Sequence, residues 1–262
     1  MRRQFRARAA LVAFLLPLLG GCTSKVTAPV GSMTVQTADD VAMQAAANVG
    51  VMQGDLQFAI STTPPALARA RQATPSRALW DTTYTYYGIT FQASRNFYDA
   101  LDNLLPSYGP LAVWLRWTST ATGTYEGPRD TASVVHSAIL DLHGIQAGQD
   151  TLQLDGACLD TLQNRFRSLD GLRMRYFLWT SNTTVNSVRL LKSTLGSGYP
   201  LDGSVTFDVS ADRLRSNNRS DVEVHFDATV VITFNGTSQP EIVVDGTYHY
   251  HWNLLTGAVT RG

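Results

Sequence analysis

The chain has 262 residues, of which 44% are hydrophobic and 16% are charged, a composition typical of a globular protein with a sizeable core. Basic and acidic residues number 21 each, but four arginines fall within residues 1–21, so residues 22–262 hold 17 basic and 21 acidic residues, a net charge of −4. This acidic balance argues against nucleic acid as a partner, and with only two lysines, Lys25 and Lys192, no polybasic stripe for anionic lipids is expected.

The first residues have the features of a bacterial export signal. Four arginines form a positively charged start: Arg2, Arg3, Arg6 and Arg8. The apolar run Ala9–Leu19 follows, and it is too short for a membrane-spanning helix, which needs about 20 residues. Leu19-Gly20-Gly21-Cys22 then matches the lipobox pattern of leucine, two small residues and cysteine. Over residues 1–22 the chain therefore resembles bacterial lipoproteins.

That resemblance implies that residues 1–21 are a signal peptide, cut between Gly21 and Cys22. It also implies that Cys22 carries a thioether-linked diacylglycerol and an acyl chain such as palmitate on the new amino terminus; no other cofactor is expected. Thr23 replaces the aspartate that retains such proteins in the inner membrane, so in a Gram-negative host the resemblance implies the outer membrane. Two alternatives stay open: secretion with Cys22 as a free thiol, and twin-arginine export through Arg2-Arg3.

Residues 22–33 are small and mostly polar, and we predict a lipidated flexible tether that reaches about 35 Å when extended. Residues 34–60 are predicted to contain an amphipathic helix, with Thr37 as its N-cap and regular helix over 38–60. Apolar residues recur in it every three or four positions: Val41, Ala45, Val49, Met52, Leu56 and Ile60. This stripe predicts that the helix docks on the following domain. Residues 61–79 contain three prolines and are predicted to be a linker.

From Trp80 onward the apolar residues alternate with a period of two, so residues 80–262 are predicted to be an antiparallel β-domain. The candidate strands are 83–98, 111–124, 131–143, 150–164, 172–190, 203–210, 221–234, 240–244 and 247–253. Asn235-Gly236 and Asp245-Gly246 predict hairpin turns. A short helix is expected at 99–105, and helix stays an alternative for 155–169.

Sequential strands with short connections pair antiparallel. The predicted fold class is therefore mainly β: an antiparallel β-meander, as a curved sheet or half-open barrel, with one N-terminal amphipathic helix.

Three histidines are candidates for a metal site. His249 and His251 are two residues apart on one predicted strand, so their side chains share a face, and His225 lies on a neighbouring strand with Glu223 and Asp227. Imidazoles and carboxylates of this kind bind zinc or a similar metal. The alternative is that these histidines only occupy a solvated face of the sheet.

Aromatic residues are the second candidate site. Tyr84 and Tyr86 share one face of their strand, as do Tyr248, Tyr250 and Trp252. Aromatic stripes of this kind line grooves for acyl chains or stack against sugars, but they also form the cores of β-sheets. Both interpretations stay open at this point.

No residues with the spacing of a catalytic motif emerge. Ser137 and His143 share a face with Asp141 but are separated by about 20 Å of strand. Cys158 is predicted to be a small buried hydrophobic residue. We therefore expect a lipid-anchored envelope protein that is a non-enzymatic binding or scaffold module, with an apolar or amphipathic ligand or an envelope protein as partner. The alternative is a metal-dependent or carbohydrate-active envelope enzyme.

Overall fold

The computed structural model describes residues 33–62, 80–86, 88–126, 130–169, 171, 173–194, 198–214 and 222–262. The predicted signal peptide with Cys22, the tether up to residue 32 and the linker from residue 63 to residue 79 lie outside these residues.

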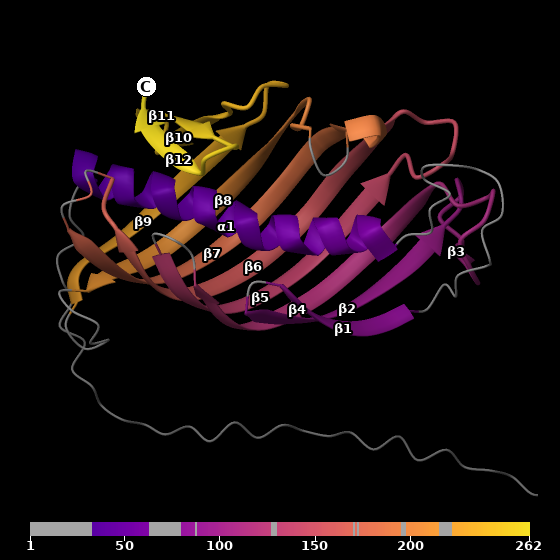
Figure 1. The fold of residues 1–262 in the computed structure, drawn as a ribbon, viewed down its shortest axis with the longest axis horizontal. Helices are drawn as coiled ribbons and strands as arrows, with labels where there is room; N and C mark the ends of the chain where they lie inside the picture. The colour runs from indigo at the N-terminus through magenta and orange to yellow at the C-terminus, as the bar shows by residue number, and fades with distance from the viewer. Residues whose placement is uncertain are drawn as a thin grey trace, which may run out of the picture.

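Within the described residues, 12 strands form one antiparallel sheet, crossed on one face by helix α1 (Figure 1). The elements in chain order are α1 (Val35–Thr62), β1 (Trp80–Tyr86), β2 (Ile89–Tyr98), β3 (Leu104–Leu105), β4 (Trp114–Glu126), β5 (Asp130–His143), β6 (Thr151–Arg167), β7 (Met174–Leu191), the 3-10 turn η2 (Lys192–Thr194), β8 (Asp202–Leu214), β9 (Val222–Thr233), β10 (Glu241–Val244), β11 (Tyr248–Asn253) and β12 (Ala258–Arg261). Apart from β3, which pairs only with β2, the strands lie side by side in chain order. The sheet stays open, with β1 and β12 at its two ends. This confirms the predicted mainly β meander with one helix near the N-terminus.

Side chains alternate between an inner face, which carries α1, and an outer face. In β5, for example, Val134 and Leu140 are buried on the inner face, whereas Val135 and Ile139 point outward and are 57% and 52% exposed. This alternation follows from the two-residue repeat of a strand and lets one face bury the core while the other meets solvent.

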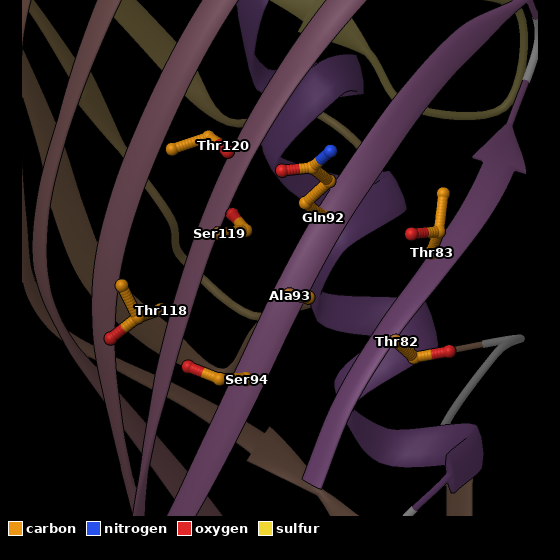
Figure 2. A pocket seen from close by; sticks show the side chains of 8 residues that line it. All are labelled: Thr82, Thr83, Gln92, Ala93, Ser94, Thr118, Ser119 and Thr120. Carbon is orange, nitrogen blue, oxygen red and sulfur yellow. The ribbon is translucent and has the colours of Figure 1, made fainter.

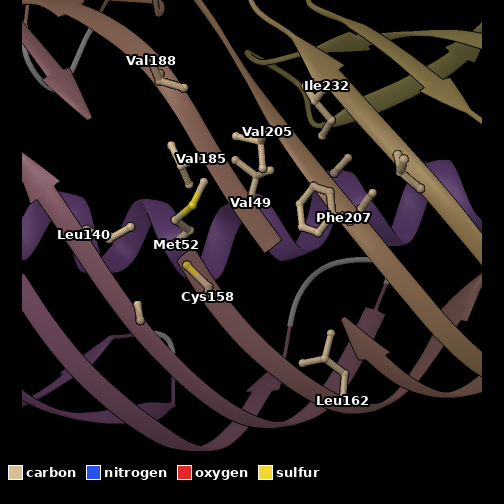
Figure 3. Close-up of a cluster of buried hydrophobic side chains, with 14 of the residues drawn as sticks. Val49, Met52, Leu140, Cys158, Leu162, Val185, Val188, Val205, Phe207 and Ile232 are labelled. Atoms are coloured by element: carbon tan, nitrogen blue, oxygen red, sulfur yellow. The ribbon is translucent and has the colours of Figure 1, made fainter. Parts of the chain in front are cut away.

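The core lies between α1 and the inner face. Figure 3 shows Val49 and Met52 of α1 over the middle strands, among Leu140, Cys158 and Val185. Cys158 is buried, as predicted. The apolar stripe of α1 is also confirmed as far as its side chains are described, because Val41, Ala45, Val49 and Met52 are all buried.

Helix α1 begins earlier than predicted. The backbone N–H of Thr37 donates a 3.2 Å hydrogen bond to Thr34 Oγ1, so Thr34 and not Thr37 caps the helix. Both residues can cap, and the hydroxyl of Thr37 lies 2.9 Å from that of Thr34. From this start α1 packs against β9, β10, β11 and β12, which confirms the predicted docking of the helix.

Two local predictions were wrong, and one alternative is decided. Residues 83–98 are not one strand but the β1–β2 hairpin, because Gly88 adopts a φ of 83° and reverses the chain there. Residues 99–105 are not helical: Asp99 Oδ1 accepts the backbone N–H groups of Leu101 and Asn103 at 2.8 and 2.9 Å, and this local turn replaces a helix start. The strand predicted at 150–164 is confirmed as β6, and the helical alternative for 155–169 does not hold, because these residues pair with β5 and β7 on both sides.

Two short strands were missed, β3 and β12. β12 pairs with β11 at the end of the sheet, and its four residues are too few to show an alternating pattern by themselves.

Candidate functional site

The two histidines of β11 lie on the outer face. His249 and His251 are exposed, and His249 Nδ1 is 2.8 Å from Glu241 Oε1 on β10. Tyr250 and Trp252 point to the inner face and are buried. This arrangement matches the expectation that His249 and His251 occupy a solvated face while the aromatic residues between them enter the core.

His225 does not join these two histidines. The strand register places His249 opposite Val243 and Val243 opposite Val231, whereas His225 lies six residues before Val231 on β9, about 20 Å away. His225 instead contacts Asp212 of β8, with its Nδ1 2.8 Å from Asp212 Oδ1. Among the described residues, no group of three or more histidine, cysteine, aspartate or glutamate side chains is arranged to hold a metal ion.

The predicted aromatic residues with described side chains belong to the inner face. The ring of Tyr84 stacks on that of Phe91, a core residue, with 4.7 Å between centroids. Tyr248 donates a 3.0 Å hydrogen bond to the carbonyl of Met33, just before α1. The side chain of Tyr86 lies outside the described part of the chain. Tyr248 and Tyr250 therefore contact the start of the helix, Tyr248 partly buried and Tyr250 fully buried.

Charged and polar residues hold the first turns of α1 against the sheet. Asp39 Oδ1 accepts a hydrogen bond from Tyr250 Oη at 3.0 Å. It also accepts one from Nε of the Arg261 guanidinium at 2.7 Å. Asp40 Oδ2 lies 3.1 Å from Arg175 Nε in a second ion pair, with both side chains largely buried. We call these five side chains the α1 clasp.

The contacts within the clasp shift the pKa values of two of its members, Tyr250 and Arg261. Burial raises the pKa of Tyr250, and the negative charge of Asp39 acts in the same direction. The hydrogen bonds and charge of Asp39 raise the pKa of Arg261. The clasp therefore favours the neutral form of Tyr250 and the protonated form of Arg261.

A second group of polar side chains lies on the inner face itself. His136 of β5 and Asp160 of β6 are opposite each other in the register, 2% and 5% exposed, with His136 Nδ1 2.6 Å from Asp160 Oδ1. Asp160 is in turn opposite Ser181 of β7. Because the aspartate, and not the histidine, is next to the serine in this register, the three residues do not have the order of a serine nucleophile activated by histidine.

Four buried residues beside this pair have polar atoms without a hydrogen-bond partner. They are Asn164 of β6 and Trp179, Ser181 and Thr183 of β7, and we call them the inner polar row. In the register Trp179 faces Leu162, Ser181 faces Asp160 and Thr183 faces Cys158, so the row follows one face of two adjacent strands. Each buried polar group without a partner costs about 1–3 kcal/mol. Such a concentration is uncommon in folded proteins.

The sequence analysis missed both the clasp and the inner polar row. A signal for the row was present, because His136 and Asp160 interrupt runs in which every second residue is apolar, namely Val134, Ala138, Cys158 and Leu162. A polar residue at a position that the alternation assigns to the core indicates either a buried pair or a binding site. No comparable signal existed for the clasp, because its members come from α1, β7, β11 and β12, which are far apart in the sequence.

The described part of the outer face carries at least two open grooves. Figure 2 shows the larger, a groove of about 600 Å³ between β1, β2 and β4, with hydroxyl-bearing side chains such as Thr83, Thr118 and Thr120 along it. The second, about 440 Å³, lies over β7 to β9 and includes Asp208, Asp227 and Asp245. None of the histidine or aromatic residues predicted as sites lines either groove.

No helix among the described residues combines the length and the apolar character needed to cross a membrane. Comparison of the chain with protein families, with curated proteins and with solved structures found no match.

Proposed function

We propose that this chain is a lipid-anchored protein of the bacterial cell envelope that binds an amphipathic ligand between the inner face of its sheet and α1. In this proposal the helix is a cover that moves aside to admit the ligand, and the protein is a binding module without catalytic activity. The anchor is supported by the lipobox Leu19-Gly20-Gly21-Cys22, and Thr23 supports the outer membrane as its location in a Gram-negative host.

The observation that carries the binding role is the polar character of the buried side of α1. Five polar residues in its first half are buried: Thr37, Asp39, Asp40, Gln44 and Asn48. These residues are buried beside the apolar stripe of α1, although buried charges lose their hydration and gain little net stability even when paired. Ion pairs hold the start of α1 on the sheet, and this kind of contact is consistent with a helix that can also separate from the sheet.

The inner face behind α1 offers a suitable surface for an apolar chain. Buried residues of neighbouring strands line it, including Val185, Val188, Val205, Phe207 and Ile232 (Figure 3). Burial of such residues against a ligand tail stabilises a complex by about 25 cal/mol for each Å² of apolar surface removed from water. An acyl chain could therefore replace contacts that α1 makes in this structure.

Binding of a fluorescent apolar probe tests the proposal. The variant Asp39→Asn keeps the shape of the side chain but removes the charge that pairs with Arg261, so it should increase the open population of α1. We expect N-phenyl-1-naphthylamine to bind the wild type, and to associate about five-fold faster with this variant, because the minor open state gains population.

The matched control is Asp202→Asn, which removes the partner of Arg189 in an exposed ion pair away from α1. This variant should bind the probe at the wild-type rate. Failure of the wild type to bind any apolar probe would contradict the binding role and favour a scaffold. Equal rates for Asp39→Asn and the wild type would contradict the role of α1 as a cover.

The anchor has its own test. Cys22→Ser removes the thiol that the lipobox resemblance assigns to lipidation, so labelled palmitate should enter the wild-type chain and not the variant. Equal labelling of both chains would contradict lipidation at Cys22.

A further inference from the structure

The inner polar row has the geometry of a binding subsite. Trp179, Ser181 and Thr183 are alternate residues of β7, so their side chains project from one face over about 14 Å. Asn164 projects from the same face of β6, one step beyond Leu162, which is opposite Trp179. All four are at most 3% exposed.

Together these side chains offer both hydrogen-bond donors and acceptors. The atoms without partners are Trp179 Nε1, Ser181 Oγ, Thr183 Oγ1 and both polar atoms of the Asn164 amide. An indole N–H only donates, whereas hydroxyls and an amide donate and accept. A ligand group with several hydroxyls or amides could satisfy all of them.

Helix α1 has a polar stripe on its buried side, and one member of the stripe contacts β7. Asp40, Gln44 and Asn48 are four residues apart and therefore share one side of the helix. Asp40 pairs with Arg175 of β7, the strand that also carries most of the inner polar row. Gln44 Nε2 donates to Asn48 Oδ1 at 3.2 Å, while Asn48 Nδ2 is a further buried donor without a partner.

The charged groups around the row occur in pairs. Asp160 is paired with His136, Asp40 with Arg175, and Arg213 of β8 with Glu223 of β9. A ligand carrying a net charge would bring into this buried region a charge without a counter-charge, which is strongly unfavourable. The row therefore suits an uncharged polar group.

We propose that the inner polar row binds the uncharged, hydroxyl- or amide-bearing head group of an amphipathic ligand. The tail of that ligand lies along the apolar residues that continue the same face, beginning with Val185, the next inward residue of β7 after Thr183. This assignment rests on the proposed binding function and adds the ligand class and the position of its head group.

The test compares three probes with the same ten-carbon tail: decyl glucoside, decanoate and decyltrimethylammonium, each below its micelle concentration. Calorimetric titration of residues 22–262 with Cys22→Ser measures their affinities. We expect decyl glucoside to bind at least about ten-fold more tightly than either charged probe. Asn164→Leu and Ser181→Ala should each weaken decyl glucoside binding about ten-fold and leave decanoate binding unchanged.

Matched substitutions on the outer face serve as controls. Asn182→Leu and Ser137→Ala change the same residue types at exposed positions of β7 and β5, and they should leave all three affinities unchanged. Thermal unfolding of the ligand-free proteins provides a second measurement. Asn164→Leu should leave the melting temperature unchanged or raise it, because the variant removes a buried amide that has no partner.

The outcomes separate this inference from the proposed function. Binding of all three probes with equal affinity, unaffected by Asn164→Leu and Ser181→Ala, would overturn the head-group site and leave the binding function in place. A large fall in the melting temperature of ligand-free Asn164→Leu would also overturn it, because Asn164 would then support the fold. Failure of every probe to bind would overturn both the head-group site and the proposed binding function.

Discussion

The same strands form both faces of the sheet, but paired polar side chains are exposed on the outer face and buried on the inner face. On the outer face ion pairs are exposed: Arg116 donates two hydrogen bonds to Asp141 at 2.8 and 2.7 Å, with its side chain 43% exposed. On the inner face the His136 and Asp160 side chains of the neighbouring strands β5 and β6 are only 1% and 7% exposed. The outer pair is screened by water, whereas the inner pair is not.

This difference shows where polar residues carry information. An outer position accepts almost any polar side chain at little cost, so the threonines and charges there say little about function. An inner position penalises a polar side chain unless a partner satisfies it. The proposed binding site therefore rests on the polar residues that nevertheless occupy inner positions.

The largest expected effect tests how closely the backbones of β5 and β6 approach each other at one glycine. Gly156 of β6 has a φ of 149°, and a Cβ there would lie 2.2 Å from the carbonyl oxygen of Ile139. Gly156→Ala should lower the free energy of unfolding by about 4 kcal/mol through backbone strain and overpacking. Gly148→Ala is the control, since no atom lies within 4 Å of a Cβ at that position. Urea unfolding measures both, and a similar small change in the two variants would contradict the close approach.

Adjacent residues of β5 compare the two faces directly. Leu140 is 1% exposed on the inner face, and its neighbour Ile139 is 52% exposed on the outer face. Leu140→Ala should cost about 3 kcal/mol because it leaves a cavity, whereas Ile139→Ala should cost less than about 1 kcal/mol. Equal losses, measured by the same unfolding experiment, would show that the outer face is covered in solution.

The smallest effect compares single hydroxyl groups. Tyr250→Phe removes the 3.0 Å hydrogen bond to Asp39 in the clasp and should cost about 1 kcal/mol. Thr90→Val removes an exposed hydroxyl that lies 3.3 Å from that of Thr85, and the stability should not change measurably. Thermal unfolding of the two variants measures this difference. An unchanged melting temperature for Tyr250→Phe would mean that the clasp does not depend on this hydroxyl.

The sequence was sufficient to predict most of the sheet. Long strands such as β5 and β9 were predicted within one residue at each end, because their alternation extends over a dozen positions. The Asp245-Gly246 hairpin was also predicted correctly, as both residues adopt positive φ values. Errors occurred where a short segment depends on its surroundings, as in the Asp99 turn and in β12.

The candidate site was less predictable than the fold. The three histidines share an outward orientation that the alternation determines, but the register separates His225 from the other two by a distance that the sequence pattern does not contain. Conversely, Asp160 interrupts the apolar alternation of its strand, but only strand pairing makes it a neighbour of Ser181 on the inner face.

By itself the sequence determined the mainly β class, the direction of most side chains and the position of the single helix, because these follow from local periodicity. Only the tertiary structure decided which residues far apart in the sequence contact each other. Tyr250 and Asp39 are 211 residues apart, and the inner polar row joins two strands that contribute separate parts of one surface. Contacts of this kind depend on register and on the placement of α1, which are set by the packing of the whole sheet and not by any short segment.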